Sequence, residues 1–372
     1  MASDNKQTTT LTPSEFSHTI IAIIIGIGIL GSTGPIEAAG NDGWLAVLIG
    51  GLYPLYMVWL ATIISKRFPK DNIISINVKI FGQYLGSLFN LLLSFFFIYY
   101  IMTVLVSFTF VTRIFIASFI PSAVITILTM LAVFFLTIKG LKTIAKVNVF
   151  IFYLTFIIVI LPGYALVKGS IINLLPVFNS GIGEIANGGL QALGRYTGIE
   201  VIFLIYPLIS DKKKLKGSML KGTIIVIAIY VWLTFIAIYY LGDVTIKFYW
   251  PILVIADSVQ IPIINLFRYV FMLFWSLIIY RINGNLLYFS SMIIKDVTHV
   301  KEKYTYVIIG VIAALACFSI VFIYNETIKR EIAKSEPAIT LAVIAYFTIV
   351  TLLVVLLKKK EPPPDSNETS KG

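Results

Sequence analysis

Very few side chains in this sequence of 372 residues could support covalent or metal chemistry. The chain has two histidines, His18 and His299, and a single cysteine, Cys317, which lie far apart along it. A metal site, or a nucleophile with its base, needs several such groups together, and no HExxH, GxSxG or phosphate-loop spacing occurs. The sequence therefore predicts no catalytic residue, no metal and no cofactor, and an enzyme is the least supported class.

Glu200 is the one acidic residue that we place inside a long apolar segment. A carboxylate in a membrane costs a few kcal/mol unless it is paired, hydrated or protonated. Arg195 lies about 140° around an intact helix from Glu200, so the two share a face only if the helix breaks at Gly198; Arg268 and Arg281 are the alternative partners. We expect Glu200 and Arg268 to form a buried ion pair, or to serve proton coupling or the binding of a ligand amine.

Clusters of glycine weaken two of the apolar segments. Glycine costs about 1 kcal/mol relative to alanine inside a helix, so each cluster indicates either close helix packing or a deliberate break. Both interpretations remain open for the first cluster taken alone. The first cluster is Gly26, Gly28, Gly31 and Gly34, followed by Pro35, and the second is Gly188, Gly189, Gly194 and Gly198.

The elements that position these residues are membrane helices. Hydrophobic residues make up 58% of the chain and charged residues only 13%, against about 25% charged in soluble proteins, and the mean hydropathy is +0.94. At roughly 20 residues per span, ten helices fit. The expected spans are Phe16–Gly34, Trp44–Ile64, Leu85–Phe110, Pro121–Ile138, Val147–Val167, Gly188–Ile209, Gly222–Leu241, Ile261–Ser290, Tyr304–Tyr324 and Pro337–Leu357.

The distribution of basic residues orients these spans. With the N-terminus in the cytoplasm, 20 of the 29 Lys and Arg residues fall in cytoplasmic loops and tails. Because cytoplasmic loops are enriched in Lys and Arg, both termini are expected to be cytoplasmic. This bias also explains the net charge of +11, so membrane lipid is an expected partner and nucleic acid is not.

The two weakened spans are the first and the sixth, so five spans separate their starts. Because five is odd, a second unit of five helices enters the membrane from the opposite face, as in inverted-repeat transporters. The predicted fold is all-α, with ten transmembrane helices as 5+5 inverted repeats of the LeuT/APC type and with helices 1 and 6 broken. The expected parts are disordered tails at residues 1–12 and 359–372 and a membrane domain at 13–358, with repeats at about 13–168 and 184–358.

In such a plan, the broken midpoints face each other near the bilayer centre, where helix ends can hold a small polar solute. Thr103 and Ser107 share a face of span three, and Gly284 and Tyr288 share a face of span eight. Helix-to-helix hydrogen bonding is the alternative role for these hydroxyl groups. The expected ligand-binding set is Gly26, Gly28, Gly31, Thr103, Ser107, Thr197, Gly198, Gly284 and Tyr288.

Several short motifs, in order and over nearly the whole chain, resemble one family. The chain is similar to the B subunits of bacterial spore germinant receptors, within the amino acid/polyamine/organocation transporter superfamily. The motifs are Gly26-Ile-Gly28-Ile-Leu30, Asp42-Gly43-Trp44, Asn173-Leu-Leu-Pro176, Gly183-Glu-Ile-Ala-Asn187, Gly198-Ile-Glu200, the lysine cluster after span six, Trp250-Pro251, and Arg268 before an aromatic helix.

The resemblance implies a permease-like subunit of the spore inner membrane that senses a germinant, an amino acid or similar metabolite, and works with an A and a C subunit. A proton-coupled amino acid symporter with Glu200 as its protonation site is the alternative function. An ion conduit opened by ligand is a third.

Overall fold

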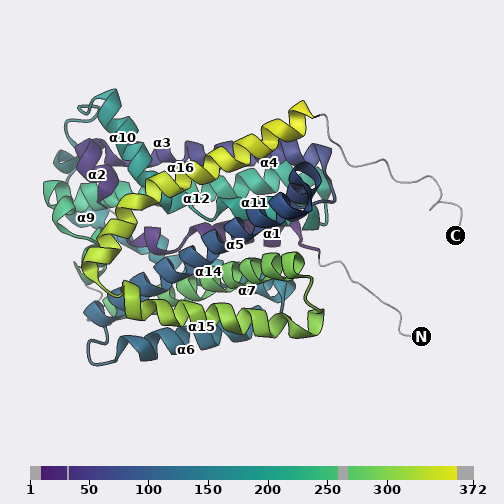
Figure 1. Cartoon of the computed structure of the whole chain (residues 1–372). Coiled ribbons are helices and arrows are strands. Elements are labelled where there is room, and N and C mark those ends of the chain that lie inside the picture. Colours follow the sequence, from purple (N-terminus) through teal and green to yellow (C-terminus); the bar gives the residue numbers. More distant parts are fainter. Residues whose placement is uncertain (1–9, 32, 259–266, 358–372) are drawn as a thin grey trace, which may run out of the picture.

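The computed structural model describes residues 10–31, 33–258 and 267–357 (Figure 1). This part of the chain is helical, apart from its connections and a single parallel bridge between Leu11 and Ile209. The expected all-α class is therefore confirmed. The predicted tails fall mainly on residues 1–9 and 359–372, which lie outside the described residues.

The first half of the chain contains nine α-helices and four short 3-10 helices among its described residues. The α-helices are α1 (Pro13–Ile24), α2 (Gly34–Ala39), α3 (Gly43–Gly50), α4 (Leu52–Arg67), α5 (Ile73–Phe115), α6 (Ser122–Thr137), α7 (Leu141–Thr155), α8 (Ile157–Ile160) and α9 (Ala165–Lys168). The 3-10 helices are η1 (Ile27–Leu30), η2 (Gly40–Asp42), η3 (Leu161–Tyr164) and η4 (Ile171–Leu174).

The second half begins with short elements and continues with long helices. Its α-helices are α10 (Ile182–Ala192), α11 (Ile202–Ile205), α12 (Leu215–Leu241), α13 (Pro251–Ser258), α14 (Phe267–Thr298), α15 (Thr305–Ile323) and α16 (Glu326–Leu356). The 3-10 helices are η5 (Leu193–Tyr196), η6 (Ile199–Val201), η7 (Tyr206–Leu208), η8 (Lys212–Lys214), η9 (Gly242–Lys247) and η10 (Glu302–Tyr304).

Six helical segments of the described chain are long and apolar enough to cross a membrane, and the bent pair α6 and α7 gives a seventh. The chain is therefore a multi-pass membrane protein, whereas the count of ten spans stays a prediction. Helix α1 packs between α12, α7 and α14, while α14 runs beside α5, α6 and α7 (Figure 1). The start of expected span eight, residues 261–266, lies outside the described residues.

Two helices extend well beyond the apolar runs that predicted them. Helix α5 begins at Ile73 and contains a break at Gly82. Gly82 has a φ of 79°, which residues other than glycine rarely adopt. Helix α16 begins at Glu326, before the expected start of span ten at Pro337. Proline is tolerated within membrane helices. The apolar run therefore predicted only the part of α16 from Pro337 onward.

Hydrogen bonds sort the loops into two groups at opposite ends of the molecule. One group is joined by Lys142 Nζ to the Thr10 carbonyl (2.9 Å), Lys212 Nζ to the Pro69 carbonyl (3.2 Å) and Arg67 Nη1 to the Val354 carbonyl (3.1 Å). The other is joined by Asn41 Nδ2 to the Leu175 carbonyl (3.0 Å), the Phe178 amide to Asp42 Oδ1 (2.8 Å) and Arg113 Nη1 to the Tyr324 hydroxyl (3.1 Å). The basic residues of the sequence assign the same two groups to opposite faces of the membrane.

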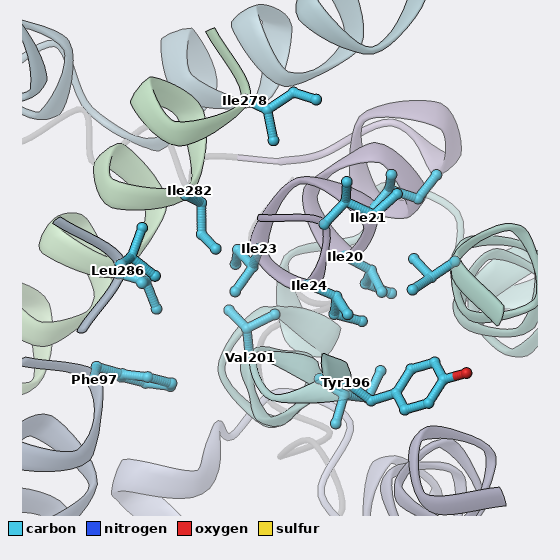
Figure 2. Close-up of a cluster of buried hydrophobic side chains, with 14 of the residues drawn as sticks. Ile20, Ile21, Ile23, Ile24, Phe97, Tyr196, Val201, Ile278, Ile282 and Leu286 are labelled. Atoms are coloured by element: carbon cyan, nitrogen blue, oxygen red, sulfur yellow. The ribbon is translucent and has the colours of Figure 1, made fainter. Parts of the chain in front are cut away.

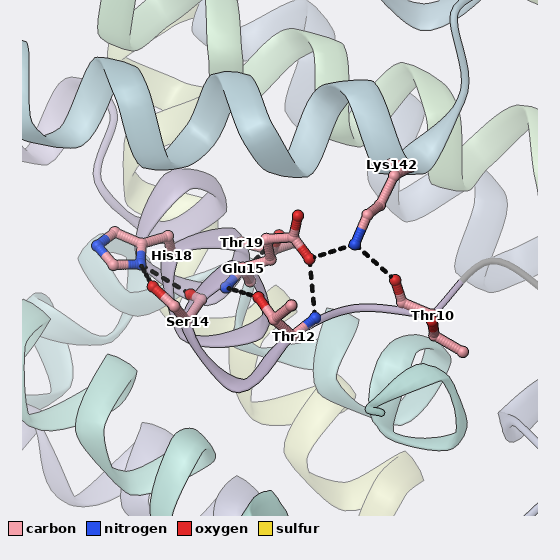
Figure 3. Close-up of polar contacts among 7 residues, drawn as sticks. All are labelled: Thr10, Thr12, Ser14, Glu15, His18, Thr19 and Lys142. Atoms are coloured by element: carbon pink, nitrogen blue, oxygen red, sulfur yellow. Dashed lines mark hydrogen bonds and ion pairs between the residues drawn. The ribbon is translucent and has the colours of Figure 1, made fainter. Parts of the chain in front are cut away.

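Residues 10–12, expected to belong to a disordered tail, are ordered. Leu11 is fully buried and exchanges two backbone hydrogen bonds of 2.8 Å with Leu208 and Ser210. Thr12 then caps α1, with its hydroxyl accepting from the Glu15 amide (Figure 3). The start of span one is thus tied to the end of span six.

Candidate ligand site at the two helix breaks

Span one is broken after Ile24, as the glycine cluster predicts. Gly26 has φ −136° and ψ −113°, outside the helical region, and the chain resumes as η1. The indole of Trp275 on α14 donates to the Gly26 carbonyl (3.3 Å), and the Tyr230 hydroxyl on α12 donates to the Ile24 carbonyl (2.8 Å). Side chains of neighbouring helices therefore satisfy backbone groups that the break releases.

Span six is broken at Thr197 and Gly198. Thr197 is extended (φ −56°, ψ 141°), and Gly198 has a φ of 108°, in the region that favours glycine. The preceding helical part ends with η5, and the following part consists of the short elements η6, α11 and η7. The predicted break of span six is present.

The two breaks lie against each other. A Cβ atom added to Gly198 would lie 2.6 Å from Ile23 Cγ2 and 3.1 Å from the Ile23 carbonyl oxygen, at the end of α1. Only glycine allows this approach, because a methyl group would overlap with backbone. The glycines thus serve both expected purposes, since they break the helices and let the broken segments touch.

Apolar side chains fill the space around this contact. Ile20, Ile21, Ile23 and Ile24 of α1 pack with Phe97, Val201, Ile282 and Leu286, all at most 1% exposed (Figure 2). The solute pocket expected between spans one and six is therefore closed in this structure. Apolar side chains from α1, α5, η6 and α14 occupy this volume.

Glu200 is fully buried beside the break and is held by two donors. Its carboxylate accepts a hydrogen bond from the Tyr53 hydroxyl on α4 and another from the Gly198 amide (2.7 Å). The break supplies the second donor, since Gly198 lies outside a helix and its amide is free to turn back. In the described part of the chain, hydrogen bonds rather than an ion pair accompany this carboxylate.

The arginines considered as partners of Glu200 lie elsewhere. Arg268 pairs with Asp257 of α13 (3.2 Å), so the structure does not bring Arg268 and Glu200 together as an ion pair. Arg195 donates to the Thr234 hydroxyl (2.9 Å). Arg281 is 1% exposed, and its Nε and Nη1 atoms have no partner among the described residues.

A small cavity borders the break of span six. It lies between α5, η5 and α16, and about 20 Å³ is open to the centre of a water molecule, enough for about one water-sized particle. Two expected ligand residues, Thr103 and Thr197, line it together with Phe96, Tyr99, Tyr100, Gly194, Glu336, Ile339 and Thr340. The structure therefore brings together Thr103 of α5 and Thr197 at the break of span six.

The other expected ligand residues are not gathered around this cavity. Gly28 faces the Tyr230 hydroxyl, Gly31 faces Pro251, and Gly284 faces Leu136 of α6. Ser107 is buried in α5, and Tyr288 packs against Phe289. These residues serve helix packing in this structure, and a role in binding remains a proposal for them.

Two residues of the site, Tyr53 and Glu336, were not predicted from the sequence. Tyr53 lies 147 positions from Glu200, and nothing local marks their pairing. Glu336 lies in a segment that qualifies as a membrane span, Lys334–Leu356, one residue before the apolar run that begins at Pro337. Helix α16 continues through the proline, so the available signal was an acidic residue directly before a span whose first residue is proline.

The fold is that of secondary transporters. Similar structures are Mhp1, a nucleobase-cation-symport-1 family transporter in a closed conformation with bromovinylhydantoin bound (TM-score 0.58, 14% identity, 88% of this chain and 76% of that one), and a mutant of the Eremococcus coleocola manganese transporter (TM-score 0.59, 13% identity, 94% and 82%). At these identities, the similarity shows the fold alone. The expected LeuT/APC-like class is confirmed.

Within that class, the chain belongs to the spore germination protein family (Spore_permease), whose model matches residues 10–330. It is 25% identical over 291 residues to spore germination protein GerQB of Bacillus cereus, covering 77% of this chain and 79% of that protein. It is 24% identical over 302 residues to spore germination protein A2 of Bacillus subtilis, covering 77% and 80%. The resemblance found in the sequence is confirmed.

Proposed function

We propose that this chain is the germinant-sensing membrane subunit of a spore germination receptor. It binds a small amino acid or a similar polar metabolite beside the two helix breaks. The contact of Gly198 with the end of α1 carries this proposal, because it joins two interrupted helices where backbone groups bond to side chains instead of within a helix. Family membership supports a role in germination.

The ligand acts by selecting a second conformation. The structure described here has the breaks closed over isoleucine side chains, so a solute binds only when this packing opens. A ligand shifts such an equilibrium by its preference for the open state, and a tenfold preference corresponds to about 1.4 kcal/mol. A few hydrogen bonds to helix ends suffice for that difference.

Thr197→Val tests the site, because it keeps the side-chain volume and removes one hydroxyl at the break. We expect germination of spores to need a higher germinant concentration, with the receptor assembled at normal levels. Thr298→Val, at the exposed end of α14, is the matched control and keeps the normal dose response. An unaltered response of the Thr197 variant in an assembled receptor would remove this position from the site.

Proton-coupled symport is the second candidate, since the fold is that of transporters and the Glu200 carboxylate lies at the break. Uptake of labelled amino acids into proteoliposomes separates the two functions. Saturable uptake that is driven by a proton gradient and lost in Glu200→Gln favours the symporter. Uptake that is absent without partner subunits favours the receptor.

The assembly that follows from the sensing role has an A and a C subunit as partners and lies in the spore inner membrane. Both termini face the cytoplasm. The grouping of the loops supports this orientation, because the loops richest in lysine, including residues 139–146 and 212–221, lie at the end where Thr10 and Val354 lie.

A further inference from the structure

The cavity beside Thr197 contains a carboxylate that has no counter-charge among the described residues. Glu336 lines the cavity, and its side chain makes no hydrogen bond or ion pair with the described residues. It lies within a segment apolar enough to span a membrane, where an ionised carboxylate is costly unless a cation or donor accompanies it. Lys334, two residues before Glu336, pairs instead with Glu331 (2.6 Å).

Two other polar groups of the cavity, the hydroxyls of Thr103 and Thr340, are suited to accept hydrogen bonds. The Thr103 hydroxyl donates to the Tyr100 carbonyl (3.0 Å), and the Thr340 hydroxyl donates to the Glu336 carbonyl (2.9 Å). Because both hydrogens are committed to helix backbone, these oxygens can offer the cavity only lone pairs. The Tyr99 hydroxyl is buried and has no partner in the described part of the chain.

The apolar part of the lining also favours positive charge. Three aromatic rings, those of Phe96, Tyr99 and Tyr100, border the cavity. Aromatic faces attract cations electrostatically, and more strongly where water is excluded. A volume of about 20 Å³ admits one particle of the size of water, which is also the size of an ammonium group.

We propose that this cavity binds a monovalent cation of ammonium size, with the Glu336 carboxylate as its counter-charge. The cation is a free inorganic ion or the amine of the ligand. The second source rests on the proposed sensing function, while the first does not. Since Glu336 approaches Gly194 so closely that a Cβ there would lie 2.6 Å from its Oε2, the bound cation also links α16 to the break of span six.

The test titrates ammonium chloride into the purified full chain in lipid nanodiscs. N-methylglucamine chloride, whose cation is too large for the cavity, keeps the ionic strength constant, and the midpoint of thermal unfolding is the readout. We expect a saturable rise in the wild type and in Glu331→Gln, which removes an exposed carboxylate of the same helix. In Glu336→Gln, the half-saturating concentration should rise at least about tenfold.

A titration without saturation in the wild type, or one that is identical in Glu336→Gln, would overturn the proposal. Thr103→Val is the second variant should Glu336→Gln fail to fold. It keeps the volume and removes one acceptor, so half-saturation should require severalfold more ammonium. An unchanged half-saturating concentration of ammonium in that variant would also count against the site.

Four further probes distinguish the source of the cation. Stabilisation by L-alanine and L-alaninamide, but not by L-lactate, through Glu336 identifies a ligand amine. Stabilisation by ammonium and potassium alone identifies a free ion. If Thr197→Val alters germination while ammonium never saturates, the sensing function stands and the cation site fails. If ammonium binds through Glu336 while Thr197→Val germinates normally, the cation site stands and the proposed sensing site fails.

Discussion

One of the two donors to the Glu200 carboxylate is available only because of the break. An intact helix would commit the Gly198 amide to a carbonyl one turn earlier, whereas here it bonds to the carboxylate at 2.7 Å. The Tyr53 hydroxyl provides the second bond from another helix. A buried charge held by two dipoles is stable only while both remain in place.

Tyr53→Phe should therefore destabilise the protein by about 1.5–3 kcal/mol, the cost of removing a hydrogen bond to a charged group. Tyr196→Phe is the matched control, because Tyr196 is equally buried but donates to a neutral acceptor, the Val47 carbonyl (2.8 Å). Thermal unfolding in detergent measures both. If the two variants lose the same stability, the charge of Glu200 has no part in the effect.

Gly198→Ala should destabilise the protein more than Gly140→Ala. Both glycines have a positive φ, 108° and 81°, so both substitutions strain the backbone at a cost of order 1–3 kcal/mol. Only at Gly198 does the added methyl group also meet Ile23, whereas nothing lies within 4 Å at Gly140. Equal unfolding temperatures for the two variants would contradict the close contact of the breaks.

Between elements, polar side chains rather than shape alone fix how the helices are arranged. Asn148 of α7 and Asn285 of α14 exchange two hydrogen bonds of 3.0 and 2.9 Å in a fully buried position. Asn148 also reaches Thr19 of α1 (3.3 Å). In a membrane, where apolar surface gives little preference for one register, such pairs define which faces meet.

Asn148→Leu and Asn285→Leu should each cost about 1–3 kcal/mol, because each leaves the other amide buried without its partner. The double variant should cost less than the two single costs together, by about 0.6–1.7 kcal/mol. A double-mutant cycle of unfolding temperatures measures this difference. Strictly additive losses would show that the two amides do not act as a pair.

The contact between Glu15 and Lys142 should make stability depend on pH. Burial raises the pKa of Glu15, but hydrogen bonds from Lys142 and Thr12 outweigh it and lower the pKa below its ordinary value (Figure 3). A lowered pKa in the folded state stabilises the protein above the unfolded pKa of about 4.3, and this contribution disappears as the pH falls through the folded value. The difference in unfolding temperature between wild type and Glu15→Gln should therefore be largest near neutral pH and should disappear at acid pH. A difference that does not change with pH would contradict this role of Glu15.

For the whole molecule, the sequence predicted the parts that depend on local chemistry. Glycine clusters marked both broken helices. It could not predict what depends on packing between distant segments: the Tyr53 bond to Glu200, the pairing of Arg268 with Asp257, or the isoleucines that close the centre. Glu336 was missed because hydropathy placed the start of span ten at Pro337, although helix α16 already begins at Glu326.

The orientation can be tested with single cysteines in a Cys317→Ala background. Lys213→Cys and Lys247→Cys place exposed thiols on the two groups of loops. An impermeant maleimide added outside intact cells that express the chain should label position 247 but not position 213. Labelling of position 213 but not of position 247 would show that the chain has the opposite orientation.

The two backbone bonds between Leu11 and residues 208–210 act as a latch on one side of the molecule. The halves of spans one and six on that side cannot separate until both bonds break, so opening there begins with the release of Leu11. Affinity tags and reporter fusions placed directly before residue 11 would disturb these two hydrogen bonds, whereas those attached after Leu357 would not.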